Sequence, residues 1–138
     1  MIKNRVQYHN ALRELAGLEG RDGQVERERV AELQYSLDEY RRLDAGQFDF
    51  TDLLGLHNIP RALIGARIAL GLSQEQFARL LDWHGNVVQR YEATDYSSCS
   101  FERVLRAASV LMQYHNFQEE LAVEIDRQLQ EQPPLLDS

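Results

Sequence analysis

The fold is decided by the stretch PRALIGARIALGLSQEQFARLLDWHGNVVQRYE, residues 60–92 of the 138-residue chain. It opens with Pro60, whose missing N–H costs little in the first turn of a helix. Gly71 supplies the left-handed conformation in which many helices end. Ser73, followed three residues later by Gln76, forms a capping-box pattern that starts a second helix. The stretch therefore predicts two helices separated by a tight turn.

A third helix is predicted at residues 86–92, after a turn at residues 82–85. Val88 and Tyr91 are three residues apart, so both should face the core. The side chains that then point outward belong to Asn86, Gln89 and Arg90. Asn and Arg contact adenine and guanine bidentately in the major groove of DNA. The pattern indicates a helix-turn-helix unit that contacts DNA bases, and simple solvent exposure of these polar residues is the alternative interpretation.

The segment resembles the helix-turn-helix domains of Cro/C1-type (Xre-family) transcriptional repressors, over well under half of the chain. The matching residues are Arg67, Gly71, Leu72, Ser73, Gln74, Phe77, Ala78, Leu81, Val88, Arg90, Tyr91, Glu92 and Phe101. The resemblance implies an all-α fold, with a five-helix Cro/C1-like domain that is preceded here by an N-terminal helical hairpin. It also implies a homodimer that places two helices in successive major grooves of double-stranded DNA.

The resemblance also implies roles for individual residues. The expected base contacts are Gly85, Asn86, Gln89 and Arg90. The expected phosphate contacts are Gln74, His84, Tyr96, Ser97 and Ser98. A structural ion pair is expected between Arg67 and Glu92, and removing one partner would leave the other charge uncompensated. Two departures weaken the expected DNA contact, because Gly85 has no side chain and the loop after the third helix contains no Lys or Arg.

The net charge opposes DNA binding over most of the chain. The formal charge is −7, with −2 on residues 1–50, −1 on Asp52 and −5 on residues 115–138, whereas residues 58–114 carry +1. A local group of arginines must therefore overcome the field of the whole chain at short range, and salt should weaken binding steeply. The acidic flanks favour a basic protein partner. An autorepressing antitoxin that binds a small basic toxin is thus a second hypothesis, and a protein-interaction module without DNA binding is a third.

Residues 1–50 predict a helical hairpin and a connector. The two helices are expected at Tyr8–Leu18 and Val25–Leu43, with glycines between them. The second helix carries an apolar seam at spacings of three, four and three residues: Val30, Leu33, Leu37 and Tyr40. A hairpin has little core of its own, so the seam needs a neighbour, which could be the following domain, a second copy or another protein. Leu33, Leu37 and Tyr40 are therefore candidate dimer or partner contacts.

The helix-turn-helix domain is expected at residues 51–114, and an acidic helix with a disordered tail at residues 115–138. A helical turn should precede the three helices, formed by Leu53, Leu54 and Leu56. A fourth helix should start at Ser98 or Ser100 and a fifth should span residues 116–130. In Cro/C1-like dimers the region after the fourth helix often forms the two-fold contact, so the resemblance makes Leu111, Tyr114 and Phe117 candidate dimer contacts. Pro133-Pro134 should end the fifth helix.

Other functional classes find little support in the chain. Cys99 is the only cysteine, which excludes an intrachain disulfide and a zinc site of several thiolates. The four histidines are dispersed without the spacing of metal ligands. We expect no enzymatic activity, cofactor or metal, because neither a glycine-rich phosphate loop nor a nucleophile elbow is present. No long apolar run predicts a membrane span or a signal peptide, so we expect a cytoplasmic protein.

Overall fold

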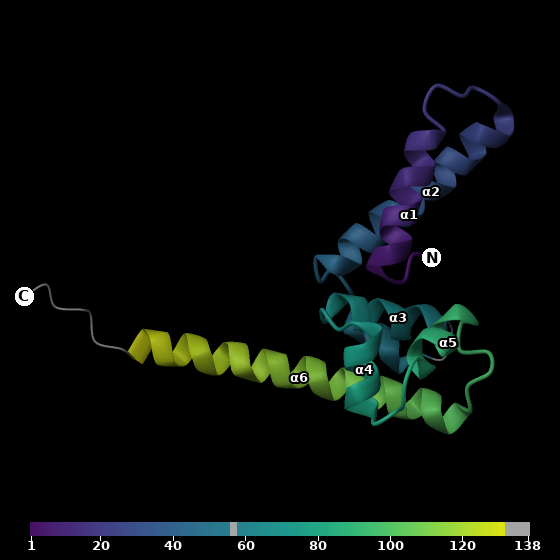
Figure 1. The fold of residues 1–138 in the computed structure, drawn as a ribbon. Helices are drawn as coiled ribbons and strands as arrows, with labels where there is room; N and C mark the ends of the chain where they lie inside the picture. Colours follow the sequence, from purple (N-terminus) through teal and green to yellow (C-terminus); the bar gives the residue numbers. More distant parts are fainter. Residues whose placement is uncertain (56–57, 132–138) are drawn as a thin grey trace, which may run out of the picture.

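The computed structural model describes residues 1–55 and 58–131, and every regular element in that part of the chain is a helix. Helices α1 (Arg5–Gly17) and α2 (Gln24–Asp44) form an antiparallel hairpin. A short 3₁₀ helix η1 (Phe50–Leu54) leads to the body of the molecule, in which α3 (Ile59–Ala69), α4 (Gln74–Leu81), α5 (Val87–Ala93) and the first half of α6 (Phe101–Glu131) pack together (Figure 1). No described helix is long and apolar enough to cross a membrane. The predicted turn residue Leu56 and the predicted tail after residue 131 lie outside the described residues.

The apolar seam of α2 is covered by the chain itself. Leu33, Leu37 and Tyr40 are 5%, 1% and 6% exposed and belong to one core cluster with residues of α1 and α3. The Tyr40 ring stacks on Tyr8 of α1, with ring centroids 5.1 Å apart. The assignment of these three residues to a dimer or partner contact is therefore wrong, because α1 and α3 already bury them.

The three helices predicted at residues 60–92 are confirmed within a residue or two. α3 ends at a glycine with a left-handed backbone, Gly71 at φ 74°. Ser73 and Gln76 form both hydrogen bonds of a capping box at the start of α4. The helices meet through fully buried side chains, among them Ile64, Phe77 and Val88 at 0%, 0% and 1% exposure. These contacts fix the orientation of α5 relative to α3 and α4.

The predicted break between a fourth and a fifth helix does not occur. Ser100 caps the start of α6, whose 31 residues continue to Glu131. The helix contains no Gly or Pro, and the residues 112–116 that separate the two predicted helices are all compatible with helix. Packing holds this segment in place, because the His115 ring stacks on Phe50 of η1 at 3.8 Å between centroids. The predicted boundary at residue 114 therefore lies inside a continuous helix.

The second half of α6, residues 116–131, projects away from the body and is called the α6 tail here (Figure 1). Its large apolar side chains are exposed: Phe117, Leu121, Val123, Ile125 and Leu129, at 48–67%. Four of them follow one another at four-residue steps, which places them along one side of the helix. Nearer the body, Leu111 on the same helix is fully buried, so its assignment as a dimer contact is wrong, whereas Tyr114 is half-buried and Phe117 is exposed.

Candidate nucleic-acid interface

A buried ion pair holds α5 against α3. The Arg67 guanidinium donates to both carboxylate oxygens of Glu92, at 2.6 Å from Nε to Oε2 and 2.8 Å from Nη2 to Oε1. The side chains of Arg67 and Glu92 are 4% and 0% exposed. Bidentate geometry and low exposure make such a pair much stronger than a surface ion pair. The structure thus confirms the ion pair predicted between these two residues.

The same pair connects three further parts of the chain. Arg67 also donates to the backbone carbonyls of Leu72, at 2.9 Å, and Lys3, at 2.6 Å. Glu92 accepts a third hydrogen bond, from Gln74 Nε2 at 2.8 Å. Every charged group at this centre therefore has partners, which buried charges require. The network ties the N-terminal segment and the start of α4 to the position of α5.

The structure brings together the residues that the sequence assigned to base contacts. Gly85, Asn86, Gln89 and Arg90 are all exposed and occupy the turn before α5 and its solvent side; we call these four residues the α5 polar face. Arg90 makes no ion pair within the described residues. Asn86 precedes the helix and makes no side-chain capping bond, so its amide is also available. The amides of Asn86 and Gln89 can therefore donate and accept hydrogen bonds toward a ligand, and the Arg90 guanidinium can donate them.

Gly85 has a conformational reason to be a glycine. Its φ is 62°, in the left-handed region, and apart from its two chain neighbours no described residue has an atom within 4 Å of the position that a Cβ would occupy. A side chain at this position would meet backbone strain and no steric clash. The left-handed backbone of the turn between α4 and α5 thus explains why this position, at which the resemblance expects a base-contacting side chain, is a glycine.

The predicted phosphate contacts divide into two groups. His84, Ser97 and Ser98 are exposed at the two ends of α5. Gln74, in contrast, uses its side chain inside the protein, because its amide nitrogen bonds Glu92 and its oxygen lies 3.5 Å from Asn4 Nδ2. A phosphate bound by Gln74 would therefore have to use its backbone N–H or displace these bonds.

The prediction that Tyr96 contacts a phosphate is wrong. Tyr96 is 5% exposed, its ring stacks on Tyr91, and its hydroxyl has no hydrogen-bond partner within the described residues. Burial, followed by the nearby Glu92 carboxylate, raises the pKa of the Tyr96 phenol well above its usual range. The backbone turns inward here because Asp95 and Tyr96 both have positive φ, 51° and 59°. The side chain fills the core under the loop and does not reach solvent.

The sequence interpretation missed the contribution of the N-terminus. Ile2 is buried at 7% exposure, and Lys3 Nζ donates to the backbone carbonyl of Glu92 and to Asp95 Oδ1, the latter at 3.0 Å. The loop after α5, which contains no Lys or Arg, thus receives a cation from the other end of the chain. One sequence signal was present: Asn4 followed by Gln7 is an N-cap pattern, and Asn4 does cap α1.

A groove of about 950 Å³ includes part of the α5 polar face in its lining. One wall is the start of α1, at residues 4–7. The other wall comes from residues 71–76, at the start of α4, and from three residues of the α5 polar face: Gly85, Asn86 and Gln89. The hairpin and the body therefore form one continuous surface at this point.

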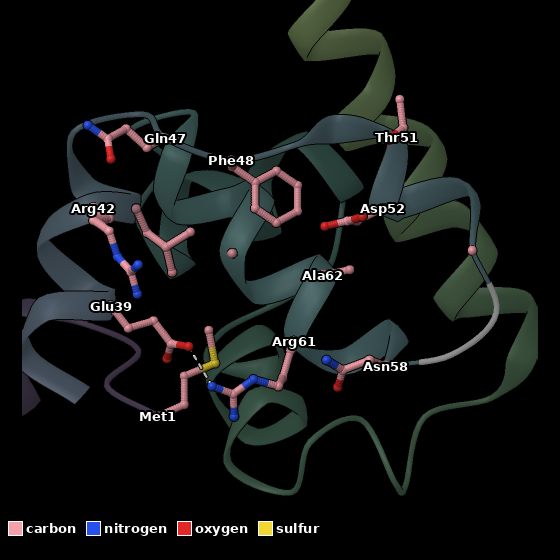
Figure 2. Close-up of a pocket in the computed structure, with 13 residues that line it drawn as sticks. Met1, Glu39, Arg42, Gln47, Phe48, Thr51, Asp52, Asn58, Arg61 and Ala62 are labelled. Atoms are coloured by element: carbon pink, nitrogen blue, oxygen red, sulfur yellow. Dashed lines mark hydrogen bonds and ion pairs between the residues drawn. The ribbon is translucent and has the colours of Figure 1, made fainter. Parts of the chain in front are cut away.

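A second cavity, of about 610 Å³, lies where the base of α2 and the connector meet α3 (Figure 2). Figure 2 shows Glu39 and Arg61 facing each other beside Met1, and their ion pair is 2.6 Å long. The Phe48 ring lies against Gly65, where an added Cβ would come within 2.8 Å of a ring carbon. Glu39 and Arg61 thus neutralise each other at this end of the cavity, whereas Arg42 and Asp52, which also line it, form no ion pair within the described residues.

No protein-family model matches the chain, and no significant match is found among curated proteins or solved structures.

Proposed function

We propose that the protein binds double-stranded DNA through the α5 polar face. The observation that carries the proposal is the geometry of this face: the side chains of Asn86, Gln89 and Arg90 are exposed together on a helix that a buried ion pair fixes to the body. Direct recognition of bases needs side chains held in a defined orientation, and Arg and Asn are suited to guanine and adenine. The resemblance of the stretch from Pro60 to Leu111 to Cro/C1-type repressors supports the same proposal, with transcriptional repression as its outcome.

The local electrostatics are compatible with this function despite the acidic chain. Arg79 and Arg90 are exposed and have no ion-pair partner within residues 1–55 and 58–131. Much of the excess of acidic residues lies in the α6 tail, which projects away from α5. We expect binding of modest affinity per subunit that falls with added salt, because phosphate contacts release condensed counterions.

The direct test is selection of a duplex from a random pool by the purified full-length protein, followed by binding titrations on the enriched sequence. Arg90→Ala should cost about 1–3 kcal/mol on that sequence and relax the preference at one base pair. Asn86→Ala/Arg90→Ala should abolish selective binding. If no sequence is enriched, or if Arg90→Ala weakens all duplexes equally, base recognition by the α5 polar face is refuted.

We further propose that the protein acts as a homodimer. Pseudo-palindromic operators match the two-fold symmetry of a dimer, with half-sites about 34 Å apart. Among the candidate dimer contacts expected from the sequence, Phe117 is still available to a second copy, because its side chain is 60% exposed. Sedimentation equilibrium of the protein and of Phe117→Glu tests this: the variant should dissociate at concentrations where the unmodified chain is dimeric. A monomer at all concentrations in both proteins would exclude the dimer.

A second candidate function, neutralisation of a basic toxin, is favoured by the α6 tail. The tail combines exposed apolar side chains with five carboxylates, and its one arginine, Arg127, is bonded to Glu124 and Glu131. An acidic amphipathic helix of this kind suits an apolar groove lined by Lys and Arg. Co-expression with the product of the adjacent gene tests the idea. Relief of growth arrest that Leu121→Glu cancels would support it, and absence of both a complex and an effect on growth would refute it.

A further inference from the structure

The first three residues of the chain are attached to the helices that carry the candidate interface. The backbone carbonyl of Lys3 accepts a hydrogen bond from the buried Arg67, and its ammonium group bonds the end of α5 and Asp95. Ile2 is part of the core. α1 therefore begins at a position set by the same hydrogen-bond network that orients α5.

The first turn of α1 carries an unpaired cation into the groove beside α5. Arg5 lines the groove together with Asn86 and Gln89, and it is exposed. It makes no ion pair within the part of the chain that the structure describes. Lys3, by comparison, is 12% exposed and already paired with Asp95. Arg5 is thus the cation of the N-terminal segment that remains available to a ligand.

We propose that Arg5 contacts a DNA phosphate next to the bases that the α5 polar face recognises, so that the N-terminal segment forms part of the DNA-binding surface. This inference rests on the proposed function and extends it. A guanidinium is suited to a phosphate because its planar N–H groups bind two oxygens at once. The contact supplies, from the start of the chain, a positive charge that the loop after α5 lacks.

The groove is not uniformly positive. Asp44 and Glu75 also line it, and both are exposed. Their carboxylates repel a phosphate. The positive charge of Arg5 is therefore needed to offset this repulsion when DNA binds at this part of the groove. Removal of Arg5 should therefore affect binding more than removal of an arginine elsewhere on the hairpin.

Arg13 provides a matched control. It lies on the same helix, eight residues or about 12 Å further along, and does not line the groove. Its guanidinium bonds Asn10 within α1. Arg5→Gln and Arg13→Gln change the net charge equally, so any effect of the whole-chain field is the same in both. A difference between them reports on position alone.

The experiment measures binding of the full-length protein to the selected duplex by fluorescence anisotropy between 50 and 200 mM salt. Arg5→Gln should lower the slope of log K against log salt by about 0.9, the value for one phosphate contact. Over this range the unmodified protein should then lose about 3.5-fold more affinity than Arg5→Gln. Arg13→Gln should retain the slope of the unmodified protein.

The outcomes separate the inference from the proposed function. If Arg5→Gln behaves like Arg13→Gln while Asn86→Ala/Arg90→Ala loses selective binding, the role of Arg5 is overturned and DNA recognition by α5 stands. If the unmodified protein selects no duplex, both fall together.

A second measurement does not depend on the substitution of Arg5. Val6 is 69% exposed beside it, so an iron chelate attached to Val6→Cys in a Cys99→Ser background should cleave DNA close to the recognised bases. Cleavage no greater than from a chelate at Arg13→Cys would contradict the placement.

Discussion

The body of the molecule and the α6 tail depart from the usual arrangement of residues in opposite ways. The body buries a full ion pair, with Arg67 3% and Glu92 0% exposed. The tail exposes large apolar residues, such as Phe117 at 60% and Leu129 at 62%. In the body the chain supplies each buried charge with a partner. In the tail the chain supplies nothing to cover the apolar side chains within the described residues.

This difference separates what stabilises the protein from what is available for binding. A buried charge without a partner is expensive, so each side chain of the Arg67–Glu92 centre depends on the others. Exposed apolar residues cost the monomer little, and a run of them along one side of a helix marks a surface for interaction. The effects of substitutions in the two regions should differ accordingly.

The largest effect is expected from breaking the buried pair. Glu92→Ala removes the partner of a buried guanidinium and should lower the free energy of unfolding by about 3–5 kcal/mol. Urea unfolding monitored by circular dichroism measures this. Glu39→Ala is the matched control, because it breaks the more exposed pair with Arg61 and should cost at most about 1 kcal/mol. Equal effects from the two substitutions would contradict the importance assigned to burial.

The next largest effect concerns the seam of α2. Leu37 is 1% exposed, so Leu37→Ala should lower the free energy of unfolding by about 2–5 kcal/mol through lost burial and a residual cavity. The loss should not depend on protein concentration, since the side chain packs within its own chain. If Leu37→Ala lowered the free energy of unfolding only at high protein concentration, the seam would be a contact with a second copy after all.

An intermediate effect is expected from Tyr96 at alkaline pH. The folded protein keeps the phenol neutral because burial raises its pKa, whereas in the unfolded chain the phenol ionises near pH 10. The contribution of this group is therefore fully present below about pH 10 and is lost above it, by about 1.4 kcal/mol per pH unit.

Tyr96→Phe should remove that alkaline loss of stability. At pH 7 it should leave the free energy of unfolding unchanged or raise it by about 1 kcal/mol, because the buried hydroxyl has no partner. Urea titrations at pH 7 and pH 10.5 on both proteins measure the difference. A variant as sensitive to alkali as the parent would place the hydroxyl in contact with solvent.

The smallest effect is expected in the α6 tail. Leu121 is 48% exposed, so Leu121→Ala should change the free energy of unfolding of the monomer by no more than about 0.5 kcal/mol. Measurement at low protein concentration keeps any self-association from contributing. A loss comparable to that of Leu37→Ala would mean that the tail packs on the body, and the comparison between the two regions would fail.

The three helices of residues 60–92 were predictable because their signals are local. Gly71, Ser73 and Gln76 act through backbone conformation and hydrogen bonds within a few residues, and the structure places all three as expected. The α5 polar face followed from the same helical spacing. The Arg67–Glu92 pair was expected only from the family resemblance, since the two residues are 25 positions apart.

The failed predictions concern contacts between distant segments. Tyr96 is polar enough for a phosphate contact, yet a left-handed backbone turns it into the core. Residues 112–116 were expected to separate two helices, yet they lie inside a continuous α6, in which the His115 ring stacks on Phe50. Local spacing carries no information about either neighbour.

The amino-acid sequence by itself determined the helices and the exposed side of α5, because caps, glycines and apolar spacing act over a few residues. Only the tertiary structure decided that α2 packs within its own chain and that Lys3 reaches the loop after α5, 89 residues away from its partner Glu92. It also placed Arg5 and Asn86 in the lining of one groove. The physical reason is that a buried charge such as Arg67 needs hydrogen-bond partners. Any segment that lies within hydrogen-bonding distance can supply them, however far it is from Arg67 along the chain.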